Sequence, residues 1–467
     1  MFIQSRSRVP LTAILLAITL GACQRRDVVN LGPVEHLNAG PAAVVATIQS
    51  PSVSLYGSHD GVLVAWLQED GDGRSVVVRH ISETLAMSAA GTPLIPSHLG
   101  DRPVSRPTIV GGVNPEEVSL IWQTTRPPQE EAFVVSRTSE DNGRSWSTGI
   151  ERSLGLTAPT SLVVADVSGT PFVTWLDQRV QRHRILFARL IEGSQQWLPS
   201  ESRFIHDPGD DSYTLKLSVA SDGADRIAVV WQEDATCAIN AIFSRDGGLK
   251  WSDPVRLDDR GELGVPAIAR VAFAGKRAVA VWSGGGQLWA DSSADGGDTW
   301  GVDTLLEDND LDDMPNFDLL GSRDVAHIAF DAEPGGRLPG IYHVALNQDG
   351  VWSAEHEGMR AVGTRGGKPA HPRLAREQDG TVYVTYEQDG RVVLLARSTD
   401  EGATFERPIT IYDQPIEDGT VRHLQVAASG GVAYVVWETL KGAERAGESR
   451  DAPTEVDLFL RRVSPPR

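Results

Sequence analysis

The stretch Ser139-Glu-Asp141-Asn-Gly143-Arg-Ser145-Trp146 decides the fold of this 467-residue chain, because the same pattern occurs four times. The common form is S-x-D-x-G-x-[T/S/K]-[W/F]. The other copies are SRDGGLKW (residues 244–251), SADGGDTW (293–300) and STDEGATF (398–405). Internal repetition of this kind fixes an architecture before any single residue fixes a chemistry.

Each position of the pattern has a physical role in a tight turn. The Ser and Asp side chains accept hydrogen bonds from backbone N–H groups. The Gly adopts a positive φ, and the aromatic residue is a large apolar anchor that can wedge between sheets. We call the four segments the repeat turns. Their structural positions are Asp141, Gly143 and Trp146; Asp246, Gly248 and Trp251; Asp295, Gly297 and Trp300; and Asp400, Gly402 and Phe405.

A second repeat covers more of the chain. Short alternating apolar runs end in an aromatic residue at intervals of 48 to 56 residues, and such runs, bounded by turn signals, predict strands. The aromatic residues are Trp66, Trp122, Trp175, Trp231, Trp282, Phe330, Tyr386 and Trp437. One unit holds four short strands, the content of a propeller blade. The sequence therefore predicts an all-β fold, a β-propeller of four-stranded antiparallel blades. We expect eight blades, with seven or six as alternatives.

The two ends of the repeat array differ from its middle. The last unit lacks an outer strand, and the segment near residues 28–37 is placed to supply it and close the ring, which would protect exposed sheet edges. The charged stretch 441–455 is poor in large apolar residues and is predicted to be a mobile loop. Incomplete repeat turns occur at residues 193–197 and 347–352.

The repeat turns resemble the Asp box, or BNR repeat, of the sialidase superfamily. That resemblance implies a β-propeller in which the boxes lie on the rim, away from the active site. It also implies a site with three arginines that grip a substrate carboxylate, an Asp acid/base, and a Tyr nucleophile paired with a Glu. A planar guanidinium suits this task because it binds a carboxylate through two hydrogen bonds.

Candidate ligand-binding residues follow from that resemblance. Arg106, in Ser105-Arg106-Pro107, is the nearest match to the family's [F/Y]-R-I-P motif, which is broken here. The other candidates lie on or just before predicted inner strands: Arg270, Arg373, Arg422, Asp101, Asp211 and Tyr213. Tyr342 is a further possible nucleophile, whereas Tyr386 occupies the repeat's aromatic position and is predicted to be a core residue. A true arginine triad and an incidental scatter of arginines both stay open at this point.

The N-terminus predicts export and a lipid anchor. Arg6 and Arg8 precede the apolar run 11–20, which is too short to span a bilayer. The sequence Leu-Gly-Ala-Cys, ending at Cys23, resembles a bacterial lipobox, which implies lipidation of Cys23; an ordinary signal peptide cut near Ala22 is the alternative. Gln24 implies the outer membrane of the bacterial envelope. The chain thus divides into a signal segment (1–22), a linker with the ring-closing strand (23–46) and the propeller (47–467).

Composition excludes some partners. The net charge is −20, and removal of residues 1–22 makes the chain two units more negative, which disfavours nucleic acid.

Asp308, Asp310 and Asp312 have the spacing that begins a calcium loop, but the following Gly and the distal Glu are missing. We therefore expect a solvated loop there, and neither metal nor cofactor. Cys237, left without a cysteine partner, is predicted to be a small core residue.

Three functional hypotheses result. The first, which the broken motif and the missing Tyr–Glu pair favour, is a non-catalytic propeller displayed in the envelope that binds a glycan or an envelope protein. The second is an exo-acting glycoside hydrolase of the sialidase type. The third is an assembly factor for an envelope complex. The sequence leaves enzymatic activity undecided and leans against it.

Overall fold

The computed structural model describes most of the propeller and part of the N-terminal segment. The described residues are 30–38, 43–44, 53–58, 60–70, 73–82, 92–94, 102–128, 131–155, 160–177, 183–191, 196–199, 203–208, 214–234, 236–259, 268–308, 315–332, 339–353, 360–363, 367–413, 419–441 and 455–464.

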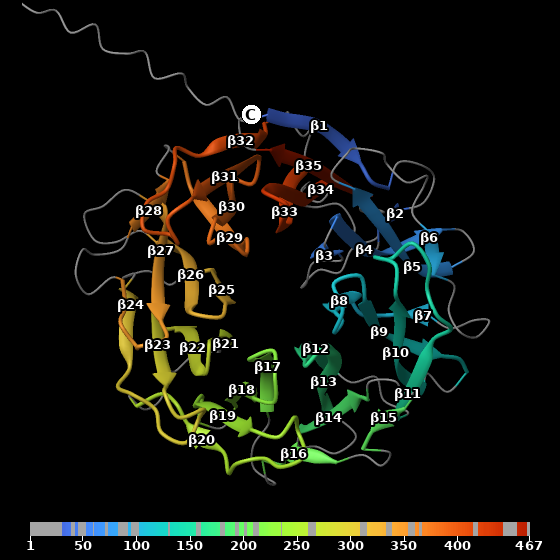
Figure 1. The fold of residues 1–467 in the computed structure, drawn as a ribbon, viewed down its shortest axis with the longest axis vertical. Helices are drawn as coiled ribbons and strands as arrows, with labels where there is room; N and C mark the ends of the chain where they lie inside the picture. Colours follow the sequence, from blue (N-terminus) through green and yellow to red (C-terminus); the bar gives the residue numbers. More distant parts are fainter. Residues whose placement is uncertain are drawn as a thin grey trace, which may run out of the picture.

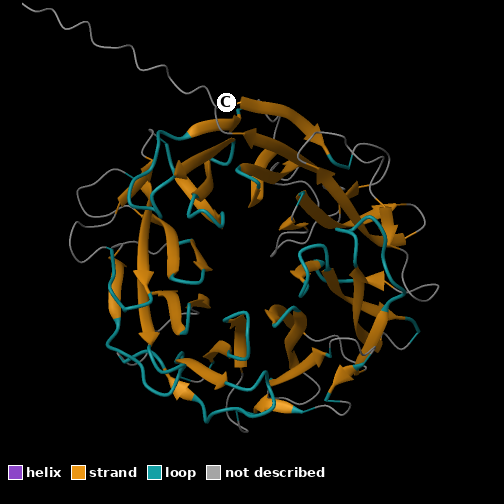
Figure 2. Ribbon diagram, viewed as in Figure 1, coloured by secondary structure: helices purple, strands orange, loops and turns teal. Residues whose placement is uncertain are grey.

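The described chain is built of strands arranged in a ring around a central channel (Figures 1 and 2). The strands form eight separate antiparallel sheets, one for each predicted unit, so the expectation of an eight-bladed β-propeller is confirmed. No helix occurs among these residues, and none could therefore cross a membrane.

The first four blades follow one another along the chain, each from the channel outward. Blade 1 holds β3 (Val53–Ser58), β4 (Gly61–Asp70), β5 (Gly73–Ser82) and β6 (Thr92–Leu94), with β2 (Ala43–Val44) extending its inner edge; blade 2 holds β7 (Arg102–Pro103), β8 (Thr108–Gly111), β9 (Val118–Arg126), β10 (Glu131–Ser139) and β11 (Ile150–Gly155); blade 3 holds β12 (Thr160–Val167), β13 (Thr170–Asp177), β14 (Arg184–Leu190), β15 (Trp197–Leu198) and β16 (Phe204–His206); blade 4 holds β17 (Thr214–Ser221), β18 (Ile227–Glu233), β19 (Ile239–Ser244) and β20 (Val255–Arg256).

The last four blades repeat the same order, and the N-terminus completes the eighth. Blade 5 holds β21 (Ile268–Ala274), β22 (Arg277–Gly284), β23 (Gln287–Ser293) and β24 (Thr304–Asp308); blade 6 holds β25 (Phe317–Gly321), β26 (Val325–Ala332), β27 (Gly340–Asn347) and β28 (Arg360–Gly363); blade 7 holds β29 (Pro369–Arg376), β30 (Val382–Gln388), β31 (Val392–Ser398) and β32 (Ile409–Tyr412); blade 8 holds β33 (Gly419–Ser429), β34 (Val432–Lys441), β35 (Glu455–Ser464) and β1 (Asn30–His36).

The ring closes where β1 pairs with β35, as the missing outer strand of the last unit predicts. His36 stacks on Phe459 and lies 3.0 Å from the carboxylate of Asp457. Next to it, the side-chain oxygen of Asn38 accepts the backbone N–H of Leu458 at 2.7 Å. Because these contacts join residues more than 400 positions apart, they tie the N-terminal segment to the last blade.

The apolar core is divided among the seams between blades. Eight buried clusters each combine residues of two neighbouring blades, including one between blades 8 and 1 that contains Trp66 and Tyr434. The eight predicted aromatic residues, from Trp66 to Trp437, are all at most 1% exposed. The apolar runs that end in these residues are nearly continuous rather than strictly alternating, because each second strand is buried on both faces.

The repeat turns share one hydrogen-bond network. In the third copy, the hydroxyl of Ser293 donates to Asp295 (2.7 Å) and accepts the N–H of Gly297 (2.7 Å). The hydroxyl of Thr299 donates to Asp295 at 2.6 Å, and its backbone N–H does so at 3.0 Å. The Thr299 hydroxyl and these N–H groups hold the pKa of Asp295 well below its usual range. The turn is thus closed by a carboxylate that stays ionised.

The glycine and the aromatic residue of each repeat turn pack against the preceding blade. A Cβ on Gly297 would lie 2.2 Å from the ring of Phe243, and Trp300 packs on the same ring at 5.6 Å. Gly143 packs on Leu63, Gly248 on Phe172 and Gly402 on His343 in the same way. Each repeat turn therefore fastens its blade to the one before it.

A histidine pair is buried in the seam between blades 6 and 7. His327 and His343 are at most 1% exposed, and Nδ1 of His327 lies 3.2 Å from Nε2 of His343. Desolvation lowers the pKa of His327 to about 4, with Glu401 opposing and Arg376 reinforcing the shift. His327 is therefore uncharged at neutral pH.

Cys237 corrects one prediction. It lies in the connection between β18 and β19, half-exposed and with φ of 51°, rather than in the core. Its Sγ lies 3.8 Å from the carbonyl of Asp234. The apolar character of the surrounding sequence comes from β19, which begins two residues later.

The predicted loop 441–455 falls between β34 and β35, and residues 442–454 lie outside the described residues.

A glycine substitution tests the fastening of the blades. Gly297 has φ of 109° and faces Phe243, whereas Gly223 has φ of 79° and no atom within 4 Å of its would-be Cβ. We expect Gly223→Ala to cost about 1 kcal/mol of unfolding free energy from the left-handed backbone alone. Gly297→Ala should cost roughly 1–3 kcal/mol more, because the methyl group overpacks the seam. Denaturant unfolding of both variants measures this, and equal losses would contradict the packing argument.

The histidine pair predicts a loss of stability in acid. Since the pKa of His327 is about 4 in the folded chain and near 6.5 when unfolded, the unfolded state takes up the proton first. Stability should fall as pH drops from about 6.5 to 4, by roughly 3 kcal/mol at most. His327→Leu, which introduces the residue found at the equivalent Leu63, should flatten this part of the profile. An unchanged slope in the variant would show that other groups cause the loss.

Candidate functional site

The innermost strand of each blade borders the channel, and equivalent positions on these strands form levels of its wall (Figure 1). One level consists of the residues that pair with the position just before each buried aromatic residue. We call it the arginine level. Its members are Ser54, Thr108, Val163, Ser218, Arg270, Asp318, Arg373 and Gln425.

Side chains at the arginine level point toward the next blade. At three seams, the side chain accepts a hydrogen bond from a backbone N–H of the next inner strand. These bonds run from Ile109 to Ser54 (3.4 Å), from Val271 to Ser218 (3.1 Å) and from Leu374 to Asp318 (2.9 Å). The inner edges of these blades are therefore joined by polar contacts, which fixes the wall of the channel.

Charged residues occupy this level on three consecutive blades. Arg270 on β21 forms an ion pair with one oxygen of Asp318 on β25, whose other oxygen accepts the N–H of Leu374. Arg373 on β29 donates to the carbonyl of Pro372 at 2.8 Å. Desolvation lowers the pKa of Arg373, the charge of Asp318 raises it, and the charge of Arg270 lowers it. Asp318 thus pairs directly with Arg270 and also attracts Arg373 electrostatically.

A third arginine lies within electrostatic reach of the other two. Arg106 lies just before β8 of blade 2, which faces blade 6 in Figure 1. Its side chain is exposed to solvent, but the protein atoms around the guanidinium still desolvate it in part. Desolvation lowers its pKa to about 10, and the guanidinium groups of Arg373 and Arg270 lower it as well. Among the described residues, no carboxylate pairs with Arg106.

The arginine cluster, Arg106, Arg270 and Arg373 with Asp318, is therefore short of negative charge. Two steps further along the inner strands, five of the eight equivalent positions are alanine: Ala165, Ala220, Ala272, Ala375 and Ala427. Small apolar side chains there confine the positive charge to one level. A cleft lined by one sign of charge concentrates the field and attracts a counter-ion.

Four inner strands carry a β-bulge directly before the arginine level. At each bulge one residue other than glycine adopts a left-handed backbone conformation. These residues are Ser161 (φ 55°), Lys216 (45°), His371 (55°) and His423 (51°). Bulges redirect side chains, and such strained conformations gather at functional sites.

The bulges of blades 7 and 8 present the same pair of residues. Nδ1 of His371 lies 2.9 Å from the carboxylate of Glu387, and Nδ1 of His423 lies 2.9 Å from that of Glu438. Both glutamates follow the buried aromatic residue of their blade and are themselves buried. The inner strands thus position two oriented imidazole rings near the arginine cluster.

The remaining sequence candidates lie elsewhere. Arg422 pairs with the buried Glu438 at 3.3 Å and does not join the cluster. Tyr342 is 3% exposed in the core between blades 5 and 6, so its proposed role as a nucleophile is wrong, whereas Tyr386 is a core residue, as predicted. Asp101, Asp211, Tyr213 and Cys23 lie outside the described residues.

The acidic run after β24 is described only at its start. Asp308 is exposed and accepts a hydrogen bond from Gln287 at 2.9 Å, while Asp310 and Asp312 lie outside the described residues. Within the described ranges, no group of three His, Cys, Asp or Glu side chains is arranged to hold a metal ion.

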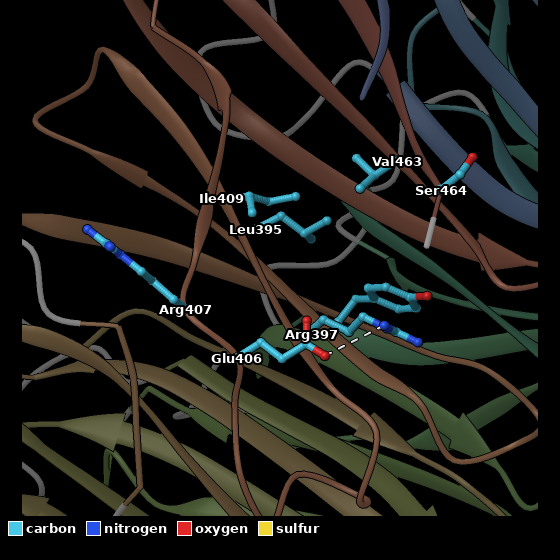
Figure 3. Close-up of a pocket in the computed structure, with 8 residues that line it drawn as sticks. Leu395, Arg397, Glu406, Arg407, Ile409, Val463 and Ser464 are labelled. Atoms are coloured by element: carbon cyan, nitrogen blue, oxygen red, sulfur yellow. Dashed lines mark ion pairs between the residues drawn. The ribbon is translucent and has the colours of Figure 1, made fainter. Parts of the chain in front are cut away.

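Two hollows lie away from the cluster. A crevice of about 20 Å³ between blades 7 and 8 has room for a single water molecule, and Figure 3 shows Arg397 and Glu406 paired there at 3.6 Å. A groove of about 390 Å³ lies between blades 2 and 3, beside Glu117, Ser139 and Leu190. Leu190 occupies the position that corresponds to Ser139, the first residue of the repeat turn in blade 2. The groove therefore lies beside a blade whose repeat turn is incomplete.

No protein-family model matches the chain, and no curated protein matches it. Among solved structures, a lectin from Burkholderia pseudomallei is 12% identical over 78% of this chain and 100% of that chain, with a TM-score of 0.51. A post-proline cleaving enzyme from Rickettsia typhi is 9% identical (85% and 59% covered, TM-score 0.49), and a Trypanosoma rangeli sialidase is 12% identical (68% and 56%, TM-score 0.36). The chain spans 55% and 59% of two prolyl-cleaving peptidases that it matches. At these identities the likeness shows the propeller fold alone.

Two site residues were missed by sequence reasoning. Asp318 and His371 belong to no recognisable motif, and their importance comes from register. Arg270 and Asp318 lie 12 residues before Trp282 and Phe330, but Arg373 lies 13 before Tyr386, so the shared level follows from strand pairing and not from a fixed count. The bulge at His371 carries no sequence signal of its own, because the equivalent bulges hold Ser161, Lys216 and His423.

The shared carboxylate makes a prediction. Asp318→Asn should cost about 1–3 kcal/mol of unfolding free energy, because the amide cannot neutralise Arg270 and Arg373. Asp308→Asn, at an exposed carboxylate, should change it by less than about 0.5 kcal/mol. Denaturant unfolding at low salt distinguishes the two, and an unaffected Asp318→Asn protein would show that the arginines are neutralised otherwise.

Proposed function

We propose that the channel mouth at the arginine cluster binds a carboxylate-bearing glycan, and that the protein is a non-catalytic binding propeller of the bacterial envelope. The observation that carries the proposal is a surplus of guanidinium groups: Arg106, Arg270 and Arg373 lie within electrostatic reach of one another, and Asp318 is the one carboxylate of the cluster. Arg106, on the opposite wall, is exposed to solvent, and the charges of both other arginines lower its pKa. A ligand carboxylate placed among them would supply the missing negative charge.

The chemistry of arginine favours a carboxylate ligand. A guanidinium presents paired N–H groups that match the two oxygens of a carboxylate, and charge-assisted bonds of this kind are stronger than neutral ones. The resemblance to the sialidase superfamily assigns its three arginines the same task. The family motif around Arg106 is broken in sequence, but Arg106 still precedes an inner strand and then the first repeat turn, which is the order of the family.

The proposed location follows from the N-terminus. Lipidation of Cys23 would anchor the chain, and Gln24 implies the outer membrane. The ring-closing strand begins at Asn30, so few residues separate that anchor from the propeller. The alternative of an envelope protein partner, or of a role in assembling an envelope complex, would use the same mouth for an acidic side chain.

A second candidate function is exo-acting glycoside hydrolysis of the sialidase type. The convergence of the arginines favours it as much as it favours binding. Hydrolysis would also require a nucleophile paired with a base. Tyr342 and Tyr386 are committed to the core, and the half-buried Tyr56 on β3 has Asp166 rather than a Glu within electrostatic reach. We therefore rank binding first.

Arginine variants test the proposal. Arg106→Ala and Arg373→Ala should each weaken binding of N-acetylneuraminic or glucuronic acid by tenfold or more, because each removes a charge-assisted contact. Arg422→Ala, which breaks a pair outside the cluster, is the matched control and should leave the affinity unchanged. Calorimetric titration of the purified protein measures all three.

The same proteins decide between binding and hydrolysis. Neither the wild type nor the variants should release a fluorescent aglycone from a sialoside. Release that is lost in Arg106→Ala would establish the hydrolase and overturn the binding module. If the affinity for acidic sugars is the same in all three variants as in the wild type, the binding site lies elsewhere.

A further inference from the structure

The histidine on the bulge of blade 7 has no role in the proposal above. We infer that His371 contacts the bound ligand and recognises its hydroxyl groups, while the arginine cluster holds the carboxylate. The inference rests on the proposed function. It narrows the ligand to a polyhydroxylated carboxylate, an acidic sugar, rather than a simple organic anion.

The position of His371 places it beside the arginines. It lies on β29, the innermost strand of blade 7, two residues before Arg373, where the pairing with β30 shifts between Ala370 and Arg373. Its side chain is 52% exposed. β29 borders the channel (Figure 1), and His371 lies on it two residues before the arginine level.

The ring is held by two neighbours. Its Nδ1 lies 2.9 Å from Oε1 of Glu387, whose side chain is only 10% exposed. A carboxylate can only accept, so in the neutral ring Nδ1 carries the proton and Nε2 is left as an acceptor. The backbone N–H of His371 donates to Asp331 on blade 6. An imidazole fixed in this way presents one nitrogen in a defined direction.

That nitrogen is available. None of the described residues hydrogen-bonds to Nε2 of His371. His423 has the same bulge and the same glutamate, but its side chain is only 19% exposed and its glutamate is shared with Arg422. The fold therefore repeats the pair on adjacent blades and leaves only one of the two histidines substantially exposed.

An oriented acceptor beside a carboxylate site selects for hydroxyl groups. A sugar hydroxyl donates its O–H to Nε2, and a site built for such a bond discriminates strongly against an analogue that lacks the hydroxyl. The left-handed conformation of His371, with φ of 55°, is a local cost that a ligand-contacting role would account for.

The test compares three ring compounds by calorimetric titration: glucuronate, its uncharged counterpart glucose, and cyclohexanecarboxylate, which has the carboxylate and no hydroxyls. Asparagine tolerates left-handed backbone and has a shorter side chain, so His371→Asn removes the contact with little strain. We expect it to weaken glucuronate roughly tenfold and to leave cyclohexanecarboxylate unchanged. His423→Asn should affect neither ligand.

The outcomes separate the two proposals. Arg106→Ala should weaken both carboxylates, and if it weakens neither, or if no carboxylate binds the wild type, the proposed function fails and the inference with it. If His371→Asn weakens glucuronate and cyclohexanecarboxylate equally, or affects neither, the anion site stands and the inference is overturned. Thermal unfolding of each variant confirms that the fold is retained.

Glu387 is argued to be a positioning residue. Glu387→Gln keeps an oxygen that accepts from Nδ1, whereas Glu387→Ala leaves the ring free to turn. The alanine variant should lose affinity for glucuronate as His371→Asn does, and the glutamine variant should recover most of it, with cyclohexanecarboxylate unchanged in both. Equal loss in the two variants would show that the charge of Glu387, rather than the orientation of His371, matters.

Discussion

The packing of each blade against its neighbours is the contact on which the rest of the molecule depends. The second strand of every blade is buried on both faces, so it requires a neighbouring sheet on each side. Eight seam cores meet this need only if the ring closes. The pairing of β1 with β35 completes blade 8, whose core with blade 1 around Trp66 and Tyr434 is the final seam, and the repeat turns fasten blade to blade on the rim. A ring held at its rim and through its seams leaves the channel wall free to vary.

That freedom explains how a repetitive scaffold acquires a single site. Equivalent residues on eight inner strands lie at one level, so any departure from the repeat is displayed beside its neighbours. At the arginine level, five positions hold Ser, Thr, Val or Gln and three consecutive ones hold charges. Residues 48 to 55 positions apart in sequence, such as Arg270, Asp318 and Arg373, become adjacent because the blade period brings them together. The site is a property of register rather than of local motif.

The two repeats of the sequence predicted most of the fold and little of the site. The apolar runs that end at Trp66 and its equivalents predict buried strands, and the repeat turns predict a closed hydrogen-bond network. Both features follow from local chemistry. The convergence of Arg106 with Arg270 and Arg373 depends on ring curvature and on which walls face each other, which no local pattern encodes. The placement of His371 depends on a bulge, and that of Cys237 on where a strand begins. The bulge and the start of the strand are local features of the backbone that the spacing of apolar residues does not reveal.

The net charge of the protein and the charge of its channel mouth have opposite signs, and the difference bears on what the mouth can accept. Surface charges more than about 8–10 Å apart are largely screened at physiological salt, so a small monoanion inside the channel responds mainly to the nearby arginines. A long polyanion would extend beyond the mouth and meet the acidic exterior along its length. A single carboxylate on an otherwise uncharged, hydroxylated body avoids that repulsion and still satisfies Arg106, Arg270 and Arg373. The acidic surface and the basic mouth thus act together to favour an acidic sugar over nucleic acid or other extended polyanions.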